Sequence, residues 1–127
     1  HTVVGSITRA AAGIGERIGA TPLVTFTQSG DTARRLSRLR NHIPLLAFSP
    51  LQTTCNQLSV SWGVHAYKVD EVRHTDEMVK QVDQFLREKK LAPEGAQVVI
   101  VAGMPPGTPG ATNSIRVHTV GERVDFD

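Results

Sequence analysis

Apolar residues recur along this chain at two spacings, every third or fourth residue in some segments and every second residue in others. The first spacing is typical of amphipathic helices and the second of half-buried strands. Helical spacing predicts helices at residues 5–19, 33–40, around 55–62, and 75–90. Apolar and alternating runs predict strands at residues 23–27, 44–49, 64–69, 97–103 and 114–120. Helices and strands therefore alternate along most of the chain.

This alternation predicts the α/β class. A helix between two strands usually makes a right-handed crossover that leaves the strands parallel. The expected architecture is a three-layer α/β/α sandwich, with a mostly parallel five-stranded sheet and an antiparallel edge strand. No linker or internal repeat divides residues 1–127, so we expect a single domain.

Some details of these elements can also be predicted. Thr75 is expected to be the N-cap of the fourth helix. Trp62 is expected in the core, because it lies at helical spacing from apolar residues. Arg116 and His118 are expected to supply the charge that protects an exposed edge strand at 114–120. The alternative is that this edge pairs with another copy of the chain.

The composition is that of an ordinary globular protein. Hydrophobic residues make up 39% and charged residues 20% of the 127 residues, which argues against a disordered or collagen-like chain. No apolar run approaches the roughly 20 residues that a membrane-spanning helix needs. We therefore expect no membrane partner.

Charge and cysteine content exclude further classes. The formal net charge is only +2, so nucleic acid is not an expected partner. The single cysteine, Cys55, cannot form an internal disulfide, which fits a cytoplasmic location. The five histidines have no metal-ligand spacing, so no metal site is expected.

The first candidate site is a hydroxyl-rich turn between the first strand and the second helix. Free N–H groups at a helix N-terminus attract anions, and Gly30 allows the backbone to approach a ligand closely. Asp31 opposes an anion there, and the alternative is that Asp31 or Thr32 simply caps the helix. The candidate residues are Thr27, Gln28, Ser29, Gly30, Asp31 and Thr32.

The second candidate is the loop at 103–113, between the last two strands. Its prolines stiffen it, and its glycines permit close backbone approach. If the first and fourth strands are parallel, this loop and the turn leave the same edge of the sheet and could enclose one ligand. The alternative is a long hairpin connection.

Other polar groups carry weaker signals. A basic patch on the second helix is typical of a solvated face, and a phosphate counter-ion or a subunit contact is the functional alternative. Ser29 lacks the G-x-S-x-G context of a nucleophilic serine. The patch comprises Arg34, Arg35, Arg38 and Arg40.

Three segments together resemble the C-terminal domain of pyruvate kinases. Residues 27–40 (TQSGDTARRLSRLR) and 44–49 (PLLAFS) resemble the family's T-x-S-G-x-S/T-A pattern and the R-P-x-x-P-I-x-A pattern that follows it. Residues 110–117 (GATNSIRV) resemble its G-x-T-N-x-x-x-V stretch. The resemblance extends over essentially the whole chain.

The resemblance implies a parent enzyme that transfers phosphate from phosphoenolpyruvate to ADP with Mg²⁺ and K⁺. It implies that this chemistry belongs to a β/α barrel and a lid domain, both absent from residues 1–127, and that no cofactor binds here. The C-terminal domain of the family supplies an effector pocket and part of the tetramer interface, so a homo-oligomer and contacts with the rest of the parent chain are expected.

The resemblance also implies roles for individual residues. The turn at 27–32 would hold an effector phosphate, and the loop would be a flap over it. The strand after the loop would lie near the subunit interface. The flap residues are Pro106, Gly107, Gly110, Thr112 and Asn113, and the interface residues are Ile115 and Val117.

This chain departs from members that respond to fructose bisphosphate. Gln28 stands where those members often carry lysine. The segment Met104, Pro105 and Pro106 stands where their flap carries tryptophan and arginine. Each charge-assisted bond lost to a second phosphate is worth roughly 1.5–3 kcal/mol. A sugar monophosphate or AMP is therefore favoured over fructose bisphosphate. The alternatives are an assembly module with a vestigial pocket, and a small free-standing α/β enzyme that acts on a phosphorylated metabolite.

Overall fold

The computed structural model describes residues 3–40, 42–103 and 112–123. Helices and strands alternate up to the final pair of strands, as predicted. The elements are α1 (Val3–Ile18), β1 (Leu23–Phe26), α2 (Asp31–Arg38), β2 (Leu45–Ser49), α3 (Gln52–Leu58), β3 (Val64–Lys68), α4 (Thr75–Glu88), β4 (Gln97–Gly103) and β5 (Thr112–Thr119).

The strands form one sheet in the order β3-β2-β1-β4-β5. All neighbouring pairs are parallel except β4 and β5, which are antiparallel. This confirms the predicted mostly parallel sheet with an antiparallel edge strand. The chain first builds outward from β1 to β3 and then returns to the other side of β1, where β4 pairs.

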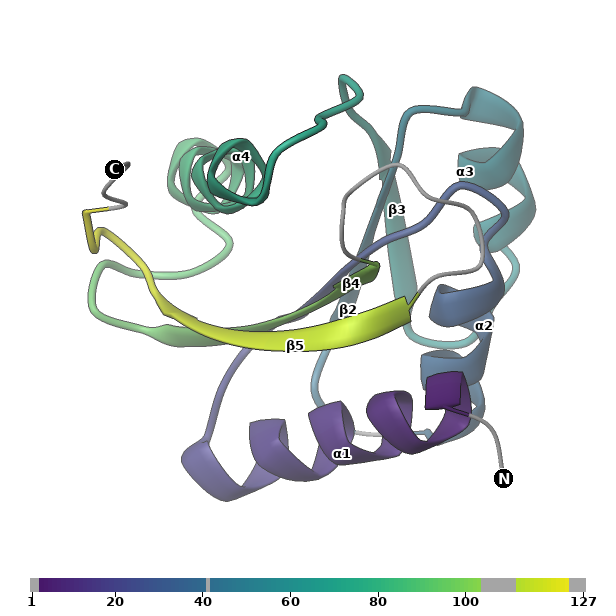
Figure 1. Ribbon diagram of the computed structural model, residues 1–127, viewed down its shortest axis with the longest axis horizontal. Coiled ribbons are helices and arrows are strands. Elements are labelled where there is room, and N and C mark those ends of the chain that lie inside the picture. The colour runs from purple at the N-terminus through teal and green to yellow at the C-terminus, as the bar shows by residue number, and fades with distance from the viewer. Residues whose placement is uncertain (1–2, 41, 104–111, 124–127) are drawn as a thin grey trace.

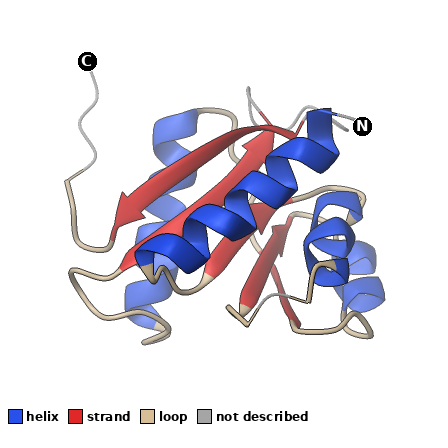
Figure 2. Cartoon of the chain, turned by 90° about the horizontal axis from the view of Figure 1, so that it is seen from below, coloured by secondary structure: helices blue, strands red, loops and turns tan. Residues whose placement is uncertain are grey.

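That reversal explains the layers. Right-handed crossovers that move in opposite directions along a sheet must lie on opposite faces. Helix α4, which makes the return crossover, covers one face, and α1 covers the other (Figure 1). Figure 2 shows α1 running diagonally across the sheet. Buried residues of α2 and α3 share the cluster to which α1 contributes, so these three helices pack on the same face.

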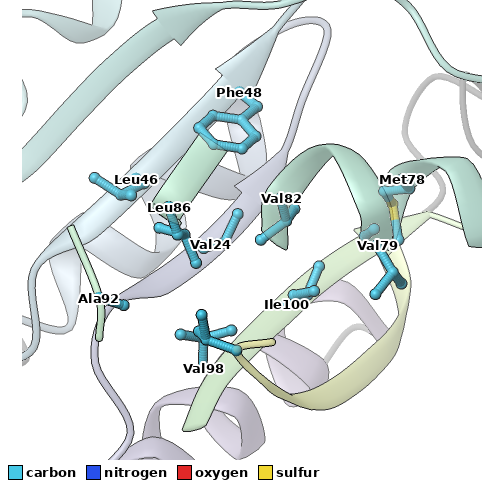
Figure 3. Packing of buried hydrophobic residues seen from close by; sticks show 12 residues of the cluster. Val24, Leu46, Phe48, Met78, Val79, Val82, Leu86, Ala92, Val98 and Ile100 are labelled. Carbon is cyan, nitrogen blue, oxygen red and sulfur yellow. The ribbon is translucent and has the colours of Figure 1, made fainter. Parts of the chain in front are cut away.

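Two apolar clusters fill the space between the layers. Beneath α4, Val82 and Leu86 pack against Val24 and Ile100 of the central strands (Figure 3). On the opposite face, Leu36 is buried in the second cluster. Alternate residues of β1 and β4 enter the two clusters, as expected for a parallel sheet that is covered on both faces.

Three detailed expectations were wrong. Helix α3 ends at Leu58, so Trp62 is not on a helical face and is 47% exposed rather than part of the core. Helix α4 begins at Thr75, so the N-cap is His74, which makes no side-chain cap. His118 is 2% exposed, because its strand position faces α4, and it cannot protect the edge as a surface charge.

Candidate functional site

The predicted turn and loop start from the same edge of the sheet. Strands β1 and β4 are parallel neighbours, with Thr25 opposite Val101 in the register. Their carboxyl ends therefore lie side by side, and the strand order reverses between them. In open α/β sheets, ligands bind in the crevice at such a reversal.

Gly30 gives the turn its shape. It is the N-cap of α2 and has φ of 90°, in the left-handed region that favours glycine. Its N–H donates to Thr27 Oγ1 at 2.8 Å, and the Asp31 N–H donates to Ser29 Oγ at 3.3 Å. The turn thus closes on its own hydroxyl groups.

The Asp31 carboxylate does not cap the helix. Its Oδ2 accepts a hydrogen bond from Arg35 Nε at 3.0 Å, and the N-cap position is occupied by Gly30, which has no side chain to cap the helix. The alternative that Asp31 merely caps α2 is therefore wrong. The ion pair also offsets the negative charge that Asp31 would otherwise place beside an anion.

Neighbouring elements hold the turn in place. The Thr27 N–H donates to the carbonyl of Phe48 in β2 at 2.9 Å. The Thr54 hydroxyl of α3 donates to the carbonyl of Gln28. Thr27 and Thr32 are buried, whereas Ser29 is exposed. The backbone is thus anchored from two sides, and Ser29 presents its side chain to solvent.

Arg34 adds a positive charge at this turn. Its Nη1 donates to the Ser29 carbonyl at 3.0 Å, and its Nη2 donates to Gln57 Oε1 in α3 at 3.3 Å. A Cβ at Gly30 would lie 3.1 Å from Arg34 Nη1, so the guanidinium packs directly against the glycine. The sequence analysis did not distinguish Arg34 from the other arginines of the basic patch. Its position one helical turn after Gly30 could have indicated that it lies at the turn.

The predicted flap is only partly within the described residues. Pro106, Gly107 and Gly110 lie outside them. Thr112 and Asn113 are the first residues of β5, and Thr112 pairs with Gly103 at a shift in the strand register. Thus these two residues lie where the 104–111 loop rejoins the sheet.

The two predicted interface residues lie on β5, the outermost strand. Ile115 packs against the cluster beneath α1, whereas Val117 is 43% exposed. Among the strands that the structure describes, none pairs with the edge of β5 that faces away from β4.

A second polar group, which the sequence did not indicate, lies under α4. Asp83 Oδ1 is 2.8 Å from His118 Nε2 and accepts a bond from the Gly121 N–H at 2.8 Å. Burial raises the pKa of the Asp83 carboxyl, but the bonds from His118 and Gly121 and the charges of His118 and Arg87 lower it by more. The pair joins α4 to the end of β5, so its role is in the fold.

The described residues carry neither a metal cluster nor a membrane span. Across residues 3–40, 42–103 and 112–123, no group of three or more His, Cys, Asp or Glu side chains is placed to hold a metal ion. None of the helices described is both long enough and apolar enough to span a membrane.

Comparison with known proteins identifies similar sequences over nearly the whole chain. Residues 5–118 match the family model described as "Pyruvate kinase, alpha/beta domain". A pyruvate kinase of Mycobacterium tuberculosis is 51% identical over 122 residues, which are 96% of this chain and 26% of that protein. A pyruvate kinase of Corynebacterium glutamicum is 42% identical over the same shares of the two chains. The chain thus spans about a quarter of the length of these relatives.

Solved structures share the fold. A crystal structure of a pyruvate kinase from Cryptosporidium parvum superposes with a TM-score of 0.84 at 20% identity, and covers 94% of this chain and 23% of that chain. The complex of a Cryptosporidium parvum pyruvate kinase with ADP also gives a TM-score of 0.84, at 22% identity. At such identities the agreement concerns the fold.

Proposed function

Because this chain belongs to the pyruvate kinase family, in which it corresponds to the C-terminal α/β domain, we propose that it binds a phosphorylated effector and contributes to subunit contacts. The longer protein would transfer phosphate from phosphoenolpyruvate to ADP, with Mg²⁺ and K⁺ bound in a barrel domain. The role proposed for these 127 residues is regulatory, and none of their side chains is proposed to act in catalysis.

The observation that carries this proposal is the anchored turn at the point where the strand order reverses. Thr27 and Ser29 each accept a backbone N–H bond, and each hydroxyl still has its own proton to donate. An O–H group that accepts such a bond is polarised and becomes a better donor to an anion. The turn therefore offers preorganised donors at the edge where the flap also begins.

Charge limits the effector to one phosphate at this turn. Arg34 is the arginine that contacts the Ser29 carbonyl, while Arg35 is paired with Asp31. Gln28 adds no charge. One guanidinium and neutral donors suit a single phosphate group. A sugar monophosphate or AMP therefore fits the turn better than a bisphosphate.

Titration calorimetry with glucose 6-phosphate and with AMP tests the proposal. Ser29→Ala should weaken binding of the effector by about tenfold, since one hydrogen bond to a charged group is worth about 1.5 kcal/mol. Ser6→Ala, at an exposed position on α1, is the matched control and should bind as the unaltered chain does. Absence of heat with both compounds would leave only the role in assembly.

That second role rests on the exposed edge of β5. A long unpaired strand edge can pair with another chain, and Val117 and Arg116 are both exposed there. A second copy of this chain is the proposed partner at this edge.

A further inference from the structure

Two serine hydroxyls share a groove of about 350 Å³ with several arginines, between α2 and the segment that joins α3 to β3. Helix α2 and the two residues after it contribute the arginines and one serine, and the joining segment, residues 59–63, contributes the other serine. The residues that line the groove are Arg34, Ser37, Arg38, Arg40, Ser61 and Trp62.

The lining is positively charged. None of the described residues that line the groove is acidic. Within residues 3–40, 42–103 and 112–123, these three arginines form no ion pair, whereas the neighbouring Arg35 is paired with Asp31. Guanidinium groups that share a small volume repel one another, so a negative charge placed among them is stabilised.

The Ser61 hydroxyl differs from the other serine hydroxyls in and beside the groove. Ser37 Oγ donates to the Trp62 carbonyl at 2.6 Å, and Ser59 Oγ donates to the Asn56 carbonyl at 2.6 Å. The Ser61 hydroxyl forms no hydrogen bond with any residue that the structure describes. It is therefore free to react or to be modified.

The Ser61 backbone is held in place, and its neighbours are open to solvent. The Ser61 N–H donates to the Leu58 carbonyl at 3.0 Å, and the Val64 N–H donates to the Ser61 carbonyl at 3.4 Å. Val60 is 90% exposed and Trp62 is 47% exposed. An enzyme that modifies a side chain must also contact its neighbours, so an exposed segment between elements is more accessible to it than a helix.

We propose that Ser61 is a phosphorylation site for a protein kinase, and that the arginines of the groove bind the phosphate once it is attached. A phosphoserine carries a charge of about −1.5 to −2 and three acceptor oxygens. Arginine presents paired N–H donors that match a phosphate. The proposal does not depend on the effector turn.

Two of the arginines are assigned to the phosphate. Arg34 already donates to the Ser29 carbonyl and to Gln57. Arg38 and Arg40 are therefore the partners of the phosphate. Their charge-assisted hydrogen bonds join the segment after α3 to the end of α2.

The modification is a phosphoryl transfer. Ser61 Oγ forms a bond to the γ-phosphorus of a nucleoside triphosphate. The bond from that phosphorus to the bridging oxygen breaks, and the nucleoside diphosphate leaves with the electron pair. The hydroxyl proton passes to a base of the kinase, and the product is a phosphate monoester on Ser61.

Phosphorus NMR tests whether the groove binds the phosphate, with phosphoserine encoded at position 61 of the longer protein that contains this chain. Cations that bind the dianion favour its formation, so its second acid dissociation constant should be at least about threefold higher than that of free phosphoserine. Phosphoserine at position 59 is the matched control, because Ser59 is exposed and does not line the groove. It should titrate within about twofold of free phosphoserine.

Arginine variants test which side chains bind the phosphate. Arg38→Gln/Arg40→Gln should bring the dissociation constant at position 61 to within about twofold of the value at position 59. Arg35→Gln, on the same helix but outside the groove, should retain most of the increase. Circular dichroism should show that each variant is folded. Equal titration at positions 61 and 59, or an unchanged value in the double variant, would overturn binding by the groove.

Fragment-ion mass spectrometry of the protein purified from its own cells tests whether the modification takes place. Phosphate should be found on Ser61, and Ser61→Ala should lose it. Phosphate on Ser37 or Ser59 instead, or none on this segment, would overturn the assignment. That result would leave the proposed effector turn unaffected, because Ser61 is not part of it.

Discussion

At the scale of single residues, one glycine and one carboxylate have roles that their neighbours define. Gly30 shapes the turn and receives the Arg34 guanidinium on its open side. Asp83 joins α4 to the end of β5 through His118 and Gly121. Substitution at either position should therefore change the stability of the chain.

Gly30→Ala should destabilise the chain by about 1–2 kcal/mol, because a Cβ is strained at φ of 90° and would crowd Arg34. Gly13→Ala is the control, since a Cβ at Gly13 meets nothing within 4 Å and its helical position favours alanine by about 0.5–1 kcal/mol. Urea unfolding of the two variants should therefore move in opposite directions. A stabilised Gly30→Ala variant would contradict the geometry of the turn.

Asp83 should make stability depend on pH in the acidic range. Its pKa is lower in the folded chain than its ordinary value, so its contribution is complete above the unfolded pKa of about 4. That contribution is lost as the pH falls from about 4 through the lower, folded pKa. Asp83→Asn should therefore show a smaller loss of unfolding free energy below about pH 4 than the unaltered chain. Denaturant titrations at several pH values give the unfolding free energy of each chain. If this free energy changes with pH equally in Asp83→Asn and in the unaltered chain, the prediction is refuted.

At the scale of elements, the helix ends show where the chain could be more stable. Helix α4 has Asp76 and Glu77 in its first turn, which suits the helix dipole, but the N-cap residue His74 makes no side-chain cap. Most of the stability of α4 comes instead from the apolar face that it packs on the sheet. A side-chain cap at this position would therefore add to the stability of α4.

His74→Asp should stabilise the chain by about 0.5–2 kcal/mol, because aspartate at the N-cap accepts a bond from the first turn and Glu77 completes a capping box. The melting temperature measured by circular dichroism should rise by several degrees. His42→Asp, an exposed position outside any helix, is the control and should change it little. A lower melting temperature for His74→Asp would show that the weak His74–Glu77 contact at 3.9 Å matters more.

At the scale of the whole molecule, the direction of the crossovers decides where functional surfaces lie. The return of the chain from β3 to β4 brings the turn after β1 beside the carboxyl end of β4. The same return leaves β5 as an edge strand on the far side of the sheet from β3. The return crossover therefore places the proposed effector turn at the carboxyl ends of β1 and β4, and the proposed subunit contact along the free edge of β5.

Val117→Lys should weaken assembly, because a lysine on an exposed strand edge opposes edge-to-edge pairing. Light scattering after size-exclusion chromatography should show a shift toward monomer at a given concentration. Val60→Lys is the control, since Val60 is 90% exposed and lies after α3, away from the edge of β5. If Val117→Lys assembles as the unaltered chain does, β5 is not the contact between copies.

Much of the fold could be predicted because it depends on local periodicity. The buried faces of α4 and β4 are encoded by apolar residues at regular spacing, and these residues lie in the core. The parallel sheet follows from the alternation of helices and strands. One error came where a single residue was assigned by spacing alone: Trp62 fitted the helical period, but α3 ends before it.

The sequence by itself determined the α/β class, the mostly parallel sheet with an antiparallel edge strand, and the hydroxyl-rich turn as a candidate site. Only the tertiary structure decided which charges belong to that turn, since Arg34 turns toward Ser29 and Arg35 toward Asp31 although they are adjacent in sequence. It also decided that His118 is buried against Asp83, 35 residues away. Periodicity is a property of neighbouring residues, whereas the partner of a polar side chain depends on which distant elements the fold brings within a few ångströms.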